Sequence, residues 1–214
     1  MKSTKLLFVL LAAITLIHAA AATASAIDMD DPRRLVGRED DVRIDAQLIQ
    51  DTLSPGSPVG VTYQIQNLSL HAVAIADKVA TASYDEDSRT VTLAVGAEVP
   101  PDGRMPHLVV IAPGEKKILR AGATPAFNAA AIRPSMGVVP RYVQLKVSIL
   151  RDLAPFEQLI AQQGRVPQNL SDAQFDSWFE SNDSIFLNSV PVRFSPRRST
   201  GTASAERRDA TGGF

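Results

Sequence analysis

Residues 59–66, with the sequence VGVTYQIQ, alternate between apolar and polar side chains. Successive side chains of a β-strand point to opposite faces, so an alternating segment has one apolar face and one polar face. The apolar face here carries Val59, Val61, Tyr63 and Ile65. The segment therefore predicts a strand with one face in a hydrophobic core and the other toward solvent.

The same alternation recurs before and after this strand. Residues 42–50 (VRIDAQLIQ) and 142–150 (YVQLKVSIL) again collect their apolar side chains in one row. Turn sequences separate these segments from other short extended ones, for example SPGSP at 54–58 and DEDS at 85–88. The further predicted strands are residues 72–76, 79–84, 89–95, 107–112 and 116–122.

Short strands at intervals of about 8–12 residues are typical of an antiparallel β-sandwich rather than of alternating strands and helices. We therefore predict a mainly β domain over residues 42–194, with an immunoglobulin-like antiparallel sandwich as its architecture. A closed barrel is the alternative arrangement of the same strands.

Residues 152–183 break the alternation and predict a two-helix insertion before the last strand. Ser171 and Gln174 have the spacing of a capping box at a helix start. Phe175, Trp178 and Phe179 follow on a single apolar stripe of that helix. The last predicted strand, residues 184–194, places on one face Phe186, Val190, Val192 and Phe194.

The N-terminus has the three parts of a secretory signal. Lys2 and Lys5 precede the apolar run at 6–17, and a small-residue stretch ends at Ala26. We expect cleavage after residue 26, with a retained membrane anchor as the alternative. The chain is then exported, to the periplasm or the outside of a bacterial cell, without a membrane span in the mature chain.

The two ends of the mature chain lack periodicity. Residues 27–41 form an acidic segment that we expect to be a flexible leader. Residues 195–214, rich in Ser, Thr, Gly, Ala and Arg, are expected to be a disordered tail.

Composition limits the possible partners and the redox chemistry. Without residues 1–26 the chain keeps 20 basic and 23 acidic side chains, a net charge of −3 that does not favour a nucleic-acid partner. The absence of cysteine excludes disulfides, so the hydrophobic core must stabilise the fold unaided.

The strand and turn residues also resemble a known family. LSPGSPVGVTYQIQNLSLHAV at 53–73, followed by IAPGEKKI at 111–118, resembles bacterial exported immunoglobulin-like modules. It is also similar to the intracellular proteinase inhibitor family of bacilli, which has the same fold class. The first resemblance implies a sandwich used for adhesion, scaffolding or chaperoning. No reactive-loop motif of the inhibitor family is present, and the helical insertion belongs to neither pattern.

The sequence nominates no catalytic, cofactor or metal site. Only His71 and His107 remain after cleavage, and no G-x-S-x-G turn occurs. We expect both histidines to be ordinary surface residues. The acidic stretches at 28–31 and 85–88 do not match the D-x-[DN]-x-[DN]-G calcium loop. We therefore expect neither a cofactor nor a metal, and we expect the protein not to be an enzyme.

The function predicted from these features is a non-catalytic binding, scaffolding or accessory module that acts through protein–protein contacts. The candidate contacts are Phe175, Trp178 and Phe179, together with the connection at 121–140, and the partner is another envelope or extracellular protein. The competing interpretation is that the aromatic stripe packs the helix onto the sheet. The alternative function is an exported hydrolase or a protein resembling a protease inhibitor.

Overall fold

Strand β4 (Val59–Asn67) lies in the middle of a four-stranded antiparallel sheet in the computed structural model, which describes residues 27–28, 30–127, 138–165 and 167–195. The predicted signal sequence at 1–26 and residues 196–214 of the predicted tail at 195–214 lie outside the described residues. The strand order is β1-β2-β4-β9. The other three strands are β1 (Arg34–Glu39), β2 (Val42–Leu48) and β9 (Lys116–Ala123).

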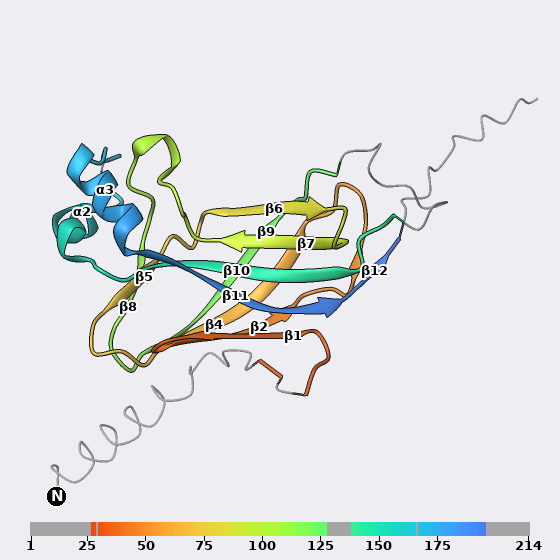
Figure 1. The fold of residues 1–214 in the computed structure, drawn as a ribbon. Helices are drawn as coiled ribbons and strands as arrows, with labels where there is room; N and C mark the ends of the chain where they lie inside the picture. Colours follow the sequence, from red (N-terminus) through yellow and green to blue (C-terminus); the bar gives the residue numbers. More distant parts are fainter. Residues whose placement is uncertain (1–26, 29, 128–137, 166, 196–214) are drawn as a thin grey trace, which may run out of the picture.

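A six-stranded sheet is built around the long strand β10 (Tyr142–Leu150). β10 pairs with β7 and with β11, and its last residue pairs with β5. The remaining strands of this sheet are β5 (Val73–Ile75), β6 (Ala80–Asp85), β7 (Thr90–Val95), β8 (Val109–Ile111) and β11 (Asn182–Pro191). The prediction of a mainly β fold with antiparallel sheets is confirmed (Figure 1).

Two strand pairs are parallel, which the sequence did not predict. β7 and β10 run parallel, and so do the short strands β3 (Thr52–Leu53) and β12 (Arg193–Phe194). Parallel neighbours require a long crossover. The chain between β7 and β10 makes one by leaving this sheet to form β9 in the other.

The apolar rows predicted on three strands face one common core. Their side chains are all buried, and residues of both large sheets belong to the same hydrophobic cluster. The rows are Val42, Ile44, Ala46 and Leu48 on β2, Val59, Val61, Tyr63 and Ile65 on β4, and Val143, Leu145, Val147 and Ile149 on β10. Period-two alternation therefore identified the inward face of each of these strands.

Strand β11 differs from its predicted orientation. Phe186 was expected in the apolar row but is 56% exposed, whereas Ile185 and Leu187 are buried. Further along, Val190 is again buried. The pairing with β10 shifts between Gln144 and Lys146, where β11 carries one extra residue. Such a bulge reverses which alternate positions face inward, so the prediction from simple alternation is wrong for Phe186.

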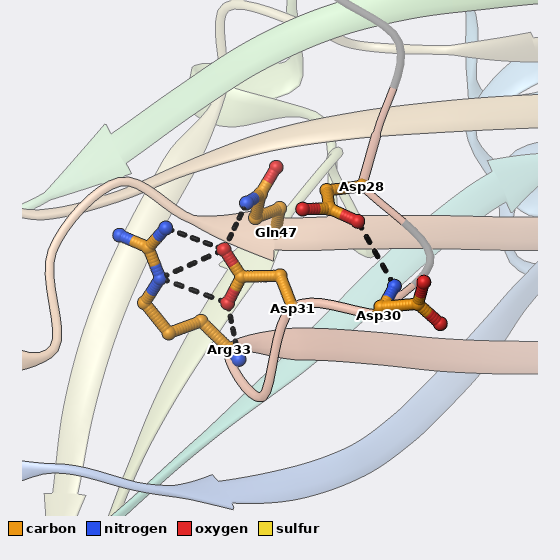
Figure 2. Close-up of polar contacts among 5 residues, drawn as sticks. All are labelled: Asp28, Asp30, Asp31, Arg33 and Gln47. Carbon is orange, nitrogen blue, oxygen red and sulfur yellow. Dashed lines mark hydrogen bonds and ion pairs between the residues drawn. The ribbon is translucent and has the colours of Figure 1, made fainter.

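The leader at 27–41 was expected to be flexible, and this is wrong for β1, which pairs with β2 along its full length. The turn before β1 is held by Asp31 (Figure 2). Its carboxylate accepts a hydrogen bond of 2.7 Å from the backbone nitrogen of Arg33 and forms an ion pair with the Arg33 guanidinium. The Gln47 side chain of β2 donates to the same carboxylate. These contacts fasten the segment to the sheet.

β1 also closes one side of the molecule against β11. The backbone nitrogen of Val36 donates to the side-chain oxygen of Asn188 across 2.5 Å. A Cβ added at Gly37 would lie 2.8 Å from Cγ of Leu187, closer than real Cβ contacts. The edge strands of the two large sheets therefore meet where a glycine permits close approach.

The helical connection lies between β10 and β11, whose residues Leu150 and Asn182 pair directly. The connection holds the 3₁₀ turn η4 (Ala154–Phe156) and the helices α2 (Glu157–Gln162) and α3 (Asp172–Ser181). Figure 1 shows both helices at the end of the six-stranded sheet near β5. The predicted capping box at Ser171 and Gln174 is confirmed, with both reciprocal hydrogen bonds present.

A second hydrophobic cluster joins this connection to the sheet. Along β5, Val73 and Ile75 enter the main core, whereas Ala74 enters the second cluster. The buried members of this cluster are Ala74, Ala76, Ala97, Leu108, Leu150, Phe156 and Trp178. Both faces of β5 are thus covered, one by the opposite sheet and one by the helical connection.

Candidate functional site

Trp178 is the predicted contact residue that the structure places in the interior. Its side chain is 1% exposed, and its ring and that of Phe156 form a T-shaped contact with centroids 5.5 Å apart. Its indole nitrogen donates a hydrogen bond of 3.0 Å to the carbonyl oxygen of Ala97. The hypothesis that Trp178 is an exposed binding residue is therefore wrong, and the competing packing interpretation holds for this side chain.

The other two predicted contact residues lie on the outer side of α3. Phe179 is 49% exposed, Phe175 is half-buried, and their rings contact edge to face with centroids 5.0 Å apart. Their spacing of four residues puts them on one side of the helix. At 100° per residue, this pair lies next to the buried Trp178 on the helix circumference. Only part of the predicted aromatic stripe thus remains available to a partner.

A row of carboxylates runs beside the phenylalanine pair. Asp172, Asp176 and Glu180 are all exposed, and their spacing of four residues places them along one side of α3. We call Phe175, Phe179 and these three acidic residues the α3 face. The acidic row was not identified from the sequence, although its regular spacing is visible there.

The segment that supports α2 and α3 comes from the loop before β8. The Gln163 side chain donates to the carbonyl oxygen of Leu108 across 2.9 Å and accepts from its backbone nitrogen across 3.0 Å. The backbone nitrogens of Met105 and Leu170 donate to Gln168 and Gly103, respectively. These bonds, together with the second hydrophobic cluster, hold the helical connection in one position on the sheet.

A shallow pocket of about 320 Å³ opens between the end of α2 and this loop. His107 and Arg165 are two of its lining residues, and both are exposed. Nδ1 of His107 lies 3.3 Å from a carboxylate oxygen of Asp77. His71 is also exposed and lies beside a different pocket, with Arg151 and Glu157. The predicted surface position of both histidines is confirmed.

The carboxylates and histidines of the described segments do not form a metal-binding cluster. Within residues 27–28, 30–127, 138–165 and 167–195, no group of three or more His, Cys, Asp or Glu side chains is placed to hold a metal ion. The acidic turn at 85–88 instead bonds internally, because Asp85 accepts hydrogen bonds from Asp87 and Ser88.

The other predicted contact segment, the connection at 121–140, is described in part. Its residues 128–137 lie outside the described residues. Phe127 packs edge to face against Tyr84 and Phe194, with ring centroids 5.6 and 6.2 Å away. The described start of this connection therefore contributes an aromatic side chain to packing rather than to an exposed surface.

Comparisons with protein-family models, with curated proteins and with solved structures found no match. In the described segments, no helix combines the length and the apolar character that crossing a membrane requires.

Proposed function

We propose that this protein is an exported, non-catalytic binding module that contacts another envelope or extracellular protein through the α3 face. The frame of the proposed module is an immunoglobulin-like sandwich, in which the two large sheets share one core and recognition elements project from the end. The shared cluster of inward side chains from both sheets supports this architecture.

One observation carries the proposal: Phe179 is half exposed on a helix that the neighbouring, buried Trp178 anchors to the sheet. A large apolar side chain is a common anchor of protein interfaces when it is exposed on a rigid support. A helix that is already ordered loses little conformational entropy on binding. The buried tryptophan therefore supports recognition indirectly, by keeping the phenylalanine pair in place.

The chemistry of the α3 face defines its proposed partner. The Phe175–Phe179 pair requires an apolar pocket or groove, and the carboxylates of Asp172, Asp176 and Glu180 require nearby Lys or Arg side chains. The partner is thus a protein with a hydrophobic groove bordered on one side by basic residues. A partner whose groove is bordered by acidic residues would instead be repelled by Asp172, Asp176 and Glu180.

The test compares two phenylalanines of similar exposure in a pull-down from the envelope fraction. Phe179 on α3 is 49% exposed and Phe186 on β11 is 56% exposed, so Phe186→Ser is a matched control for Phe179→Ser. We expect Phe179→Ser to lose the bound protein and Phe186→Ser to retain it. Equal recovery by both variants and the wild-type chain would exclude the α3 face as the contact surface.

A further inference from the structure

The outer face of the four-stranded sheet carries an ordered grid of side chains, ten of which are polar or charged and two of which, Val36 and Ile118, are apolar. Strand pairing aligns its outward residues in three rows that cross all four strands. The first row is Arg34, Gln47, Thr62 and Arg120; the second is Val36, Asp45, Gln64 and Ile118; the third is Arg38, Arg43, Gln66 and Lys116. We call these twelve residues the polar grid.

The polar grid is strongly basic although the whole chain is nearly neutral. It contains five cationic side chains and one carboxylate, that of Asp45. Cations occupy its four corners, at Arg34 and Arg38 on β1 and at Lys116 and Arg120 on β9. Neighbouring strands lie about 4.8 Å apart and alternate residues about 6.7 Å apart, so the corners span a surface of roughly 14 by 13 Å.

Asp45 holds two of these cationic side chains in place. Its side chain is 7% exposed and lies between Arg34 and Arg43, with ion-pair distances of 2.5 and 2.8 Å. A buried carboxylate between two guanidinium groups fixes their positions on the surface. The remaining cations, Arg38, Lys116 and Arg120, are exposed.

Between the cations lies a band of amide and hydroxyl side chains. Gln64 and Gln66 lie on β4, next to Thr62, and both are half-buried; among the described residues neither side-chain amide has a hydrogen-bond partner. The Gln47 amide, in contrast, is bound to Asp31 (Figure 2). An amide both donates and accepts hydrogen bonds, whereas an arginine or lysine only donates. The amides of Gln64 and Gln66 therefore suit a ligand that presents hydroxyl groups as well as negative charge.

We propose that the polar grid binds a polysaccharide that carries uronate carboxylates. The corner cations bind carboxylates, and Gln64 and Gln66 bind sugar hydroxyls between them. The glycan chain runs along the rows, because carboxylates border the grid at both strand ends, with Asp31 beyond the first row and Asp40 and Asp41 in the turn beyond the third. This surface is separate from the α3 face.

Other polyanions fit the grid less well. Single-stranded nucleic acids are bound largely by stacking of bases on aromatic side chains, and none of the twelve grid residues is aromatic. Lipid phosphates offer mainly acceptors, so the acceptor oxygens of Gln64 and Gln66 would remain unused. An acidic peptide has backbone N–H donors as well as carboxylates, so polyglutamate is the probe that separates a peptide from a glycan. A uronate polymer uses both kinds of group.

The test measures the affinity of the full chain for polygalacturonate by titration calorimetry at low salt. Lys116→Gln with Arg120→Gln removes two corner cations and is expected to weaken binding about tenfold or more, because hydrogen bonds to charged groups are the stronger ones. Lys78→Gln with Arg165→Gln makes the same charge change outside the grid and should have little effect. These four side chains are exposed, so both variants are expected to fold.

A second pair of variants separates sugar recognition from charge alone. Gln64→Ala with Gln66→Ala should weaken binding of polygalacturonate severalfold and leave binding of polyglutamate unchanged. Duplex DNA, vesicles of anionic lipid and neutral dextran complete the set of probes. The proposal is overturned if polygalacturonate does not bind, if polyglutamate, DNA or vesicles bind the grid as tightly, or if the control pair weakens binding equally.

Discussion

The indole nitrogen of Trp178 donates a hydrogen bond of 3.0 Å to the carbonyl oxygen of Ala97, 81 residues earlier in the chain. The side-chain nitrogen of Asn182 donates to the same oxygen across 2.8 Å. The Trp178–Ala97 hydrogen bond joins α3 to the segment that follows β7. It gives the only tryptophan of the chain a structural role and leaves Phe175 and Phe179 on the accessible side of the helix.

Trp178→Ala is expected to lower the free energy of unfolding by about 3–5 kcal/mol, because it empties a buried aromatic site. Trp178→Phe keeps much of the packing and removes one of the hydrogen bonds to the Ala97 oxygen. It should therefore lower the free energy of unfolding less than Trp178→Ala does. Urea unfolding measures both. Phe179→Ala, at a half-exposed position, is the control and should change stability far less; an equally small loss for Trp178→Ala would contradict the packing role.

Replacing residues 151–181 by the two-residue turn Asn-Gly tests how the helical connection contributes. Leu150 and Asn182 are a directly opposed pair, which a two-residue hairpin turn can join. The main core should stay intact, but the loss of buried Phe156 and Trp178 is expected to reduce stability by about 3–6 kcal/mol. Thermal melting checks the result. A variant as stable as the wild type would mean that the helical connection does not contribute to the stability of the sheets.

Gly37→Ala is expected to destabilise the protein by about 1–3 kcal/mol, since the added Cβ meets Leu187 at 2.8 Å where β1 and β11 approach each other. Gly60→Ala is the matched control on β4. Its Cβ would meet only the end of the flexible side chain of Ile49, which is 57% exposed and free to move. Equal unfolding midpoints for the two variants would show that the β1–β11 contact is loose.

Asp45→Asn should flatten the acid dependence of stability. Burial alone would raise the pKa of Asp45, but its hydrogen bonds to Arg34 and Arg43 outweigh this and lower the pKa. A lowered pKa means stabilisation that is present above the unfolded value of about 3.9 and is lost as the pH falls below it. We expect Asp45→Asn to cost about 1–3 kcal/mol at pH 7 and progressively less toward pH 2.

Urea unfolding at a series of pH values from 7 to 2 measures this dependence. Asp176→Asn removes an exposed carboxylate on α3 and serves as the charge-matched control. Parallel pH profiles for Asp45→Asn and the wild type would contradict the stabilising role of the Asp45 ion pairs.

Tyr63→Phe is expected to leave stability unchanged or raise it by about 1 kcal/mol. The Tyr63 side chain is fully buried, and its hydroxyl oxygen has no hydrogen-bond partner among the described residues, so removing the hydroxyl removes an unsatisfied polar group. Urea unfolding at pH 7 checks this. Tyr142→Phe, which deletes a hydroxyl from a side chain 41% exposed, is the matched control.

The same variant should protect against alkaline unfolding. Burial, with a smaller contribution from Asp77, raises the pKa of Tyr63. Below the unfolded pKa of about 10, Tyr63 is neutral in both the folded and the unfolded wild type. As the pH rises above that value, only the unfolded chain ionises, and the free energy of unfolding falls by up to about 1.4 kcal/mol per pH unit. Identical losses in Tyr63→Phe and the wild type between pH 9 and 11 would contradict the burial of this phenol.

The strand pattern and one helix start could be predicted because both are local. Alternation in 59–66 identified the inward row of β4, and the spacing of Ser171 and Gln174 identified the capping box of α3. β1 was missed because only Leu35 and Gly37 face inward on it, and a glycine gives no apolar signal. The bulge in β11 was missed because it is a feature of the pairing with β10.

The candidate sites depended on contacts between distant segments. Phe175, Trp178 and Phe179 form one stripe in the sequence, and only the position of Ala97 and Phe156 decides that Trp178 is buried while Phe179 is accessible. The aromatic stripe alone is equally compatible with packing and with binding.

The sequence by itself determined the mainly β character of the chain, the inward faces of its regular strands and the start of α3, because side-chain alternation and helix capping involve residues close together in the chain. Only the tertiary structure decided where charge gathers. The chain is nearly neutral, yet the registers of β1, β2, β4 and β9 bring five cations onto one face. Strand register depends on partners far away in sequence, so this basic face cannot be predicted from the net charge or from the local sequence pattern.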